Sequence, residues 1–178
     1  MTEYYIKMKD LAVGYQGNAL ISDINLKIKK GEIVTLIGPN GAGKSTILKT
    51  ITKQLKILGG AVYIGDTSMS NMRDSEIART LSMVMTERLK TELLSGSDVV
   101  ASGRYPYTGK FGILSEDDWA KVDEAIALVH AQDVQDQDFR KMSDGQRQRL
   151  MLARAICQDT DILLLDEPTS YLDMGFKL

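Results

Sequence analysis

The strongest chemical signal in the chain lies in a short stretch near its N-terminus. Residues 38–45 read GPNGAGKS and match the phosphate-binding pattern G-x-x-x-x-G-K-[ST] at every specified position. Glycines let the backbone N–H groups turn inward, Lys44 supplies a point charge for the outer phosphates, and the Ser45 hydroxyl can hold Mg²⁺. The pattern therefore predicts a site for a nucleotide phosphate chain and its magnesium ion.

Two adjacent carboxylates form a second group that could do chemistry. Asp166 and Glu167 end the apolar run ILLL, which is typical of a strand buried on both faces of a parallel sheet. Open α/β sheets bind ligands at the carboxyl ends of their strands. Asp166 could therefore hold Mg²⁺ through its water shell opposite Ser45, and Glu167 could orient or deprotonate an attacking water.

A third group precedes a strong helix pattern. Residues 142–146 read MSDGQ, and Ser143 is a favoured N-cap for the helix that continues over residues 147–156. Such a sequence often serves capping alone, but Gly145 is unusual inside a first helical turn unless something approaches its backbone closely. This helix start is therefore a candidate for a second anion site.

The hydrophobic periodicity predicts the elements that position these groups. The β-branched segment 32–37 is expected to be a strand that enters the phosphate loop, and residues 44–52 a helix that leaves it. A helical subdomain is expected from residue 86 to residue 142, and one of its helices opens with a Ser115 cap. Further strands are expected at residues 4–9, 24–29, 61–64 and 81–85.

Composition narrows the classes of function. The chain has 178 residues, of which 43% are hydrophobic, and this suits one α/β domain with a substantial core. Its 22 Lys and Arg against 24 Asp and Glu leave no basic stripe, so nucleic acid is not expected as a partner. Cys157, the single cysteine, is interpreted as buried packing. No apolar run approaches the ~18 residues that cross a bilayer, which predicts a cytosolic chain unless a partner holds it at a membrane.

Tyr15 and a group of lysines are less specific signals. Tyr15 follows the first predicted strand and either packs at the strand end or presents a ring on which a base could stack; the residues alone leave both open. The cluster Lys27, Lys29 and Lys30 is interpreted as a solvated strand face.

Together these motifs resemble the ATP-binding subunits of ABC transporters over essentially the whole chain. Residues 38–45 look like the family's Walker A loop, residues 142–146 like its signature sequence in a variant form, residues 163–167 like its Walker B strand and residues 170–173 like its D-loop. Tyr15 matches the position whose ring stacks on adenine in that family.

A narrower resemblance rests on residues 103–107, GRYPY, and on the Ser-Asp-Gly form of the signature. Both look most like the subfamily that imports iron–siderophore complexes, haem or vitamin B12. The resemblance implies a subunit that couples ATP binding and hydrolysis by a dimer to transport of an iron–siderophore or related chelate through a membrane permease.

The resemblance also implies the fold. It is an α/β fold with a P-loop NTPase core, an N-terminal antiparallel β subdomain and an inserted helical subdomain. In a single ABC ATPase domain over residues 1–178, residues 1–85 and 158–178 would form the nucleotide-binding core with the β subdomain. Residues 86–157 would form the helical subdomain, including the signature helix.

ATP and Mg²⁺ are the cofactors that the resemblance implies. Glu167 is then the expected catalytic carboxylate, and Ser45 and Asp166 are the expected Mg²⁺ contacts. The residues expected to contact the nucleotide are Tyr15, Gly38, Pro39, Asn40, Gly41, Ala42, Gly43, Lys44, Ser45, Thr46, Ser143, Gly145 and Gln146.

The implied partners are a second copy of the chain and the membrane permease. Two copies would pair head to tail, so that Ser143 and Gly145 of one copy close over ATP on the Walker A loop of the other. The permease would hold the pair on the inner face of the cell membrane, with its groove beside residues 86–107.

The chain departs from the family pattern at two points, and both bear on its expected ATP turnover. Where the family has a glutamine after the strand ending at Met85, the chain reads Thr86-Glu87, and either side chain could replace it in the Mg²⁺ shell. The chain also reaches Leu178 before the family's phosphate-contacting histidine. It is therefore expected to be the N-terminal portion of a longer ATPase, with part of the core missing, that turns over ATP poorly. The alternatives are a soluble ABC-type ATPase not linked to transport and a nucleotide-binding module without turnover.

Overall fold

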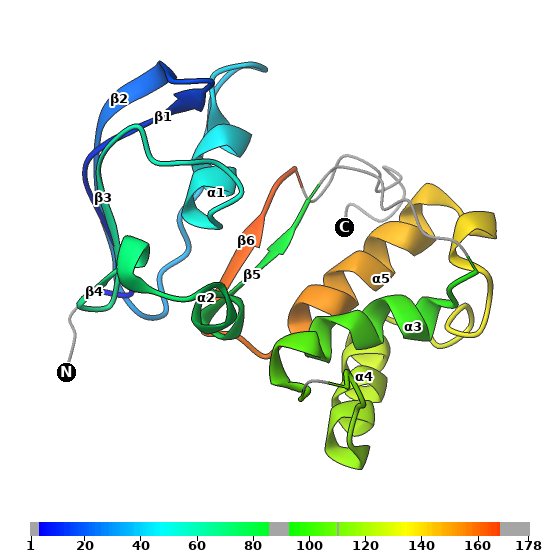
Figure 1. Cartoon of the computed structure of the whole chain (residues 1–178). Helices are drawn as coiled ribbons and strands as arrows, with labels where there is room; N and C mark the ends of the chain where they lie inside the picture. The colour runs from blue at the N-terminus through cyan, green and yellow to red at the C-terminus, as the bar shows by residue number, and fades with distance from the viewer. Residues whose placement is uncertain (1–3, 86–92, 110, 168–178) are drawn as a thin grey trace. The chain divides into compact units, whose positions relative to one another are not determined.

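The computed structural model describes residues 4–85, 93–109 and 111–167, which divide into two units between Ile77 and Ala78 (Figure 1). The first unit contains the phosphate loop, and the second contains the paired carboxylates and the predicted signature helix. The predicted mixed α/β character is confirmed.

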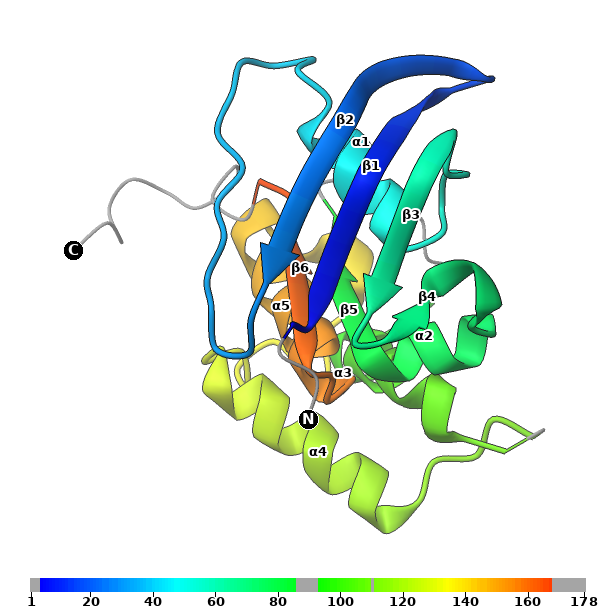
Figure 2. The same ribbon diagram turned by 90° about the vertical axis from the view of Figure 1, so that its left-hand side faces the viewer.

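An antiparallel sheet frames the first unit. β1 (Ile6–Tyr15) lies between β2 (Asn18–Ile28) and β3 (Gly59–Ile64), and β4 (Thr67–Ser68) pairs with β3. Figure 2 shows helix α1 (Lys44–Ile51) behind this sheet. The predicted N-terminal antiparallel β part is therefore confirmed.

A bulge in β1 keeps its apolar side chains on one face of the sheet. Ile6 and Met8 are buried, and so are Leu11 and Val13, which are out of step with them by one residue. The register of β1 against β2 shifts between Met8 and Leu11, where Asp10 has a positive φ of 48°. An extra residue in one strand restores the inward alternation, which is the effect of a β-bulge.

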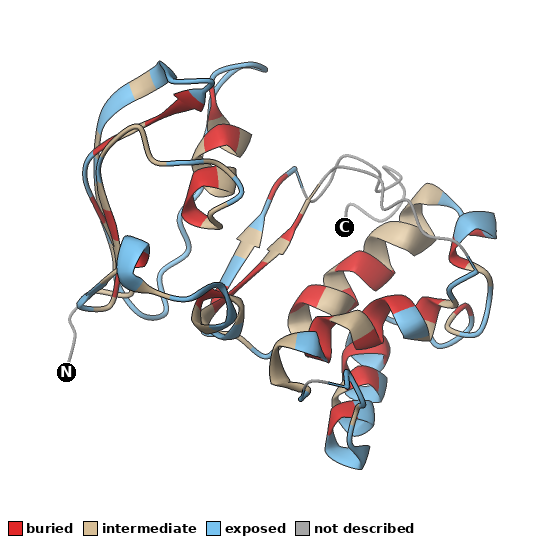
Figure 3. Ribbon diagram, viewed as in Figure 1, coloured by how far each residue is buried: buried red, intermediate tan, exposed pale blue. Residues whose placement is uncertain are grey.

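Helices dominate the second unit, which begins within α2 (Asp74–Thr80). α3 (Gly96–Ala101), α4 (Glu116–Leu128) and α5 (Asp144–Cys157) share one apolar core, and Figure 3 shows buried residues on all three helices. β5 (Leu81–Val84) and β6 (Ile162–Leu165) pair in parallel. Three short 3₁₀ segments are η1 (Met69–Asn71), η2 (Ser102–Tyr107) and η3 (Phe139–Lys141). No helix within the described ranges is both long enough and apolar enough to cross a membrane.

Three helices of the second unit begin with the same local device, a capping box. Ser95, Ser115 and Ser143 each accept a hydrogen bond from the backbone N–H three residues on, and the side chain at that position bonds back. Such reciprocal bonds satisfy two otherwise unpaired groups at a helix start. The caps predicted at Ser115 and Ser143 are confirmed.

The strand predicted over residues 32–37 is wrong. Residues 33–40 have no regular secondary structure, and Ile33 and Ile37 are 96% and 92% exposed. β-branched side chains suit a strand, but a strand also needs a neighbour that pairs its backbone groups, and none of the described residues pairs with this segment.

Burial of β6 on both faces is also wrong. Leu163 and Leu165 are 43% and 40% exposed, whereas Ile162 is buried. Within the described residues, packing covers only one face of this strand. The proposed domain boundaries stay a prediction, because residues 86–92 and the predicted D-loop lie outside the described residues.

Candidate nucleotide site

The phosphate loop ends where its backbone turns sharply into α1. Gly43 is the N-cap of the helix and has a left-handed conformation with φ 90°. A Cβ atom there would lie 2.6 Å from Ile21 Cδ1, a side-chain end that can shift, so it is the backbone conformation that favours glycine. Gly41 has φ 81° with open space around it, so its conformation alone favours glycine. Gly41 and Gly43 thus direct the chain into the first turn of α1.

Lys44 reaches back across the loop. Its Nζ donates to the carbonyl oxygens of Gly38 and Pro39, at 2.8 Å and 2.9 Å. The backbone N–H of Ala42 also donates to Pro39 O, at 3.2 Å. These contacts keep the ammonium group beside the loop, at the N-terminus of a helix, where a phosphate would meet two sources of positive charge.

Tyr15 and Thr46, both predicted nucleotide contacts, are brought together by the fold. The Tyr15 hydroxyl lies 3.1 Å from Thr46 Oγ1. A two-residue turn at Gln16 and Gly17, both with positive φ, places Tyr15 at the end of β1, and Thr46 lies in the first turn of α1. Thr46 is buried and the tyrosine is 49% exposed, so the ring lies beside the phosphate loop and open to solvent. Sequence reasoning named both residues but missed this bond.

Asp166 and Glu167 follow β6 and differ in surroundings. The Asp166 backbone N–H donates to Val84 O at 3.0 Å, which continues the β5–β6 pairing by one residue, and the residue is only 7% exposed. Glu167 is exposed and has a positive φ of 46°, which turns the chain away from the strand direction. One carboxylate is therefore held in place at the strand end, while the next is open to solvent. Glu87 lies outside the described residues.

Ser143 and Gln146 use their side chains at the start of α5. Gln146 N donates to Ser143 Oγ at 3.2 Å, and Ser143 N donates to Gln146 Oε1 at 2.8 Å. Gly145 is half-buried in the same turn. Arg147 bonds to Asp144 at 2.7 Å and to the carbonyl of Arg140 at 3.2 Å. The geometry accounts fully for the capping role; the nucleotide-contacting role of this turn stays a prediction.

The GRYPY motif at residues 103–107 has a structural role that the sequence did not reveal. Arg104 is buried, and its Nε donates to Asp118 Oδ1 at 2.9 Å while its Nη1 donates to Cys157 O at 2.9 Å. Its guanidinium also lies 4.0 Å from the centre of the Tyr107 ring. One side chain thereby joins η2, α4 and the end of α5. Hydrogen bonds from Ser115, with a further bond from Arg104, lower the pKa of Asp118.

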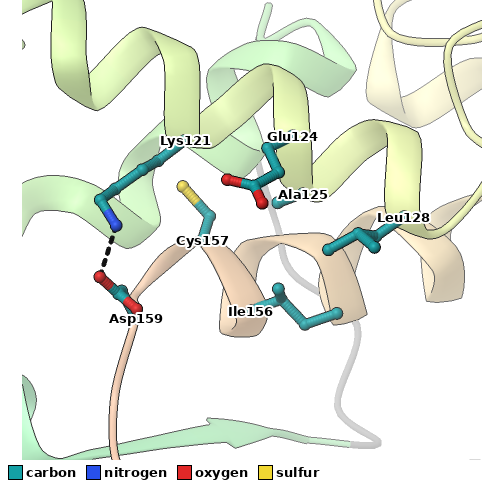
Figure 4. Close-up of a pocket in the computed structure, with 7 residues that line it drawn as sticks. All are labelled: Lys121, Glu124, Ala125, Leu128, Ile156, Cys157 and Asp159. Carbon is teal, nitrogen blue, oxygen red and sulfur yellow. Dashed lines mark hydrogen bonds and ion pairs between the residues drawn. The ribbon is translucent and has the colours of Figure 1, made fainter.

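A small cavity lies between α4 and α5, with a volume of about 110 Å³ (Figure 4). Its lining residues are Lys121, Glu124, Ala125, Leu128, Ile156, Cys157 and Asp159. Burial raises the pKa of the Cys157 thiol to about 11, so the group is a neutral thiol near pH 7 and a poor nucleophile. Cys157 is buried, which confirms its predicted packing role.

A comparison with protein families supports the assignment of this site to nucleotide binding. The family model described as ABC transporter matches residues 21–170, which include the phosphate loop, the signature sequence and both carboxylates. The chain belongs to the ABC transporter family. Membership confirms the resemblance that the motifs carry, and it implies nucleotide binding.

Two curated relatives cover 97% of the chain. The ABC transporter ATP-binding protein MJ0873 of Methanocaldococcus jannaschii is 44% identical over 173 residues. The iron(3+)-hydroxamate import ATP-binding protein FhuC of Bacillus subtilis is 36% identical over 173 residues. The matched parts are 60% and 64% of those relatives' own lengths, so the chain spans about three fifths of them.

A solved structure shares the fold. The ATP-binding cassette MJ0796, in a dimeric post-hydrolysis state bound to ADP and Pi, superimposes with a TM-score of 0.80 at 27% identity. The match covers 96% of this chain and 77% of that one. The likeness confirms the predicted fold class.

Proposed function

We propose that the chain is the ATP-binding and ATP-hydrolysing subunit of an ABC importer. The observation that carries the proposal is the phosphate loop. It leads into α1 at Gly43, and the Lys44 ammonium group bonds to the loop carbonyl groups of Gly38 and Pro39. The 36% sequence identity to the iron(3+)-hydroxamate import ATP-binding protein FhuC supports an iron–siderophore or a related chelate as the transported substrate.

The nucleotide lies along the loop and the first turn of α1. Backbone N–H groups of residues 38–46 and the Lys44 ammonium bind the phosphates, and the Tyr15 ring, held beside Thr46, stacks on the base. Mg²⁺ prefers oxygen ligands, and the Ser45 hydroxyl and the Asp166 carboxylate are such groups. Asp166 fits this role because it is nearly buried at a strand end. When bound, Mg²⁺ neutralises charge on the phosphate oxygens.

Glu167 is the residue that activates water. It follows the buried Asp166, is exposed, and carries a carboxylate able to accept a proton. Thr86 or Glu87 then completes the surroundings of the metal, in place of the family's glutamine.

A second copy of the chain completes the site. The start of α5 offers Ser143, Gly145 and Gln146 at a helix N-terminus, where anions are favoured. The dimeric state of the MJ0796 cassette supports pairing of two copies, in which each copy would supply this turn to the other copy's nucleotide.

The pair acts on a membrane permease from the cytoplasmic face of the membrane. Closure over ATP and reopening after hydrolysis would shift the permease between inward- and outward-facing states, because a ligand drives a conformational change by its differential affinity for the two states.

Replacing Glu167 by Gln tests the hydrolytic role. Glu167→Gln keeps the shape of the side chain but removes the base, so ATP affinity should stay unchanged while conversion of bound ATP to ADP slows by about 10²-fold or more. A single-turnover assay with Mg²⁺ follows that conversion even when turnover is slow. Asp161→Asn, which removes an exposed carboxylate just before β6, is the matched control and should convert ATP at the parental rate. Conversion by Glu167→Gln as fast as by the parent would show that another group activates water.

A further inference from the structure

One face of the four-stranded sheet gathers lysines and tyrosines that the proposed function does not use. The lysine face consists of Lys7, Lys9, Lys27 and Lys29 with the rings of Tyr4 and Tyr63. Successive side chains of a strand point to opposite faces, so residues that alternate with the buried Ile6 and Met8 point away from the core. Figure 2 shows the sheet from this side, with α1 behind it.

Like charges oppose each other on the lysine face. Lys7 and Lys27 are direct partners in the β1–β2 register, an arrangement that destabilises an antiparallel pair. Among the described residues, no carboxylate lies within ion-pair distance of Lys7, Lys9 or Lys27. Asp10, next to Lys9 in the chain, instead accepts a hydrogen bond from Asn25. The lysine face therefore keeps a local positive charge, although the net charge of the chain is −2.

A hollow lies on this face between β1 and β2. The hollow has a volume of about 550 Å³ and is lined by Lys7, Met8, Lys9, Asn25, Leu26 and Lys27. It adjoins the bulge where the register of β1 against β2 shifts. Three lysines thus line a space large enough for an anionic head group.

Tyrosine rings hold the ammonium groups in place. Lys7 Nζ lies 5.8 Å from the centre of the Tyr63 ring, and Lys27 Nζ and Lys29 Nζ lie 5.3 Å and 5.6 Å from the centre of the Tyr4 ring. Cation–π attraction acts over such distances. Because these rings already carry ammonium groups, they offer no free platform for stacking nucleic-acid bases.

We propose that the lysine face binds the anionic phospholipid head groups of a membrane surface. Its cations are all lysines, whose compact charges on flexible stems suit head groups in many orientations, whereas the bidentate geometry of arginine suits one fixed phosphate or carboxylate. Tyrosine, with an apolar ring and a polar tip, is enriched where protein meets the membrane–water interface. The inference goes beyond the proposed function, which requires no contact with lipid.

Vesicle flotation of the 178-residue chain tests the proposal. The chain should float with vesicles of phosphatidylcholine and phosphatidylserine, should not float with phosphatidylcholine alone, and should be released by salt. Lys7→Gln/Lys27→Gln should weaken binding about 25-fold, since each lysine near an anionic surface contributes about fivefold. Lys7→Arg/Lys27→Arg retains both charges and should bind as the parent does.

A control pair of substitutions distinguishes an effect of the lysine face from an effect of net charge alone. Lys56→Gln/Lys141→Gln makes the same change in net charge at two exposed lysines outside the lysine face and should keep parental vesicle binding. Equal loss in both glutamine pairs, or no binding of the parent to phosphatidylserine vesicles, would overturn the proposal. A polyglutamate peptide or a single-stranded oligonucleotide that binds the parent in place of vesicles would overturn it too.

ATP affinity measured on the same proteins keeps the two proposals apart. Lys7→Gln/Lys27→Gln should bind ATP as the parent does. A parent that floats with vesicles but does not bind ATP would contradict the proposed function and leave the lysine face standing.

Discussion

Single residues decide how the nucleotide site is built. Gly43 turns the loop into α1 in a conformation that other residues rarely adopt, and Lys44 ties the loop to itself. The bond between Tyr15 and Thr46 joins the end of β1 to the first turn of α1. The expected base contact and the expected phosphate contacts are therefore linked through one pair of hydroxyl groups.

The Tyr15 ring and its hydroxyl should make separate contributions to ATP binding. Tyr15→Phe keeps the ring but loses the bond to Thr46, so ATP should bind about fivefold more weakly, the value of one ordinary hydrogen bond. Tyr15→Ala removes the stacking surface and should weaken ATP binding about 10- to 100-fold. Both affinities can be measured by calorimetric titration. Inorganic tripolyphosphate, which has no base, should bind Tyr15→Ala as it binds the parent; ATP affinity unaffected in Tyr15→Ala would remove the ring from the site.

Among the helices and strands, the first turns of the helices explain most of how side chains are positioned. The capping box at Ser115 also positions Asp118 for its ion pair with the buried Arg104, and Arg104 in turn bonds the end of α5. The start of α4 is thereby fixed to the end of the helix that carries the signature sequence. A defect at Asp118 should loosen the helical unit rather than the phosphate loop.

Asp118 should make stability depend on pH. Its folded-state pKa is lowered by hydrogen bonds from Ser115 and Arg104, so the stabilisation is present above its ordinary pKa of about 4 and is lost as pH falls through the lowered value. Asp118→Asn should cost about 2 kcal/mol in free energy of unfolding near pH 7, since it breaks a charge-assisted bond. Urea denaturation at neutral and strongly acidic pH measures this, and the difference between parent and variant should shrink in acid.

Asp117→Asn is the matched control for that experiment. Asp117 lies in the same first turn of α4 and is exposed, so its replacement should change stability by no more than about 0.5 kcal/mol. A parent–variant difference for Asp118→Asn that is the same in acid as at neutral pH would contradict the assignment of the lowered pKa.

Helices proved more predictable than strands for a physical reason. α1, α4 and α5 satisfy their backbone groups internally, and their caps at Ser115 and Ser143 are readable from a few neighbouring residues. Residues 32–37 have strand-like side chains, yet strand formation depends on a partner that local sequence does not name. The Arg104 ion pair was missed for the same reason, since Asp118 is distant in the chain.

At the scale of the whole molecule, the sequence predicted the family and the fold class, while the role of each site residue rests on the proposed function. The motifs alone located the phosphate loop, the carboxylate pair and the signature helix because each follows a fixed local spacing. The charge arrangement was not predictable: Lys27, which was interpreted as part of a solvated strand face and is exposed, lies directly opposite Lys7 of the neighbouring strand. Register, unlike spacing, comes only from the folded sheet.

Residues 38–46 should hold ATP, and calorimetric titration of ATP with Mg²⁺ into the parent chain and into Lys44→Ala measures this binding. The parent should bind ATP, and Lys44→Ala should bind at least about tenfold more weakly, because a charge-assisted contact is lost. Lys49→Ala, at the other end of α1, should stay within about twofold of the parent. Equal affinities of the parent and Lys44→Ala for ATP would contradict the account.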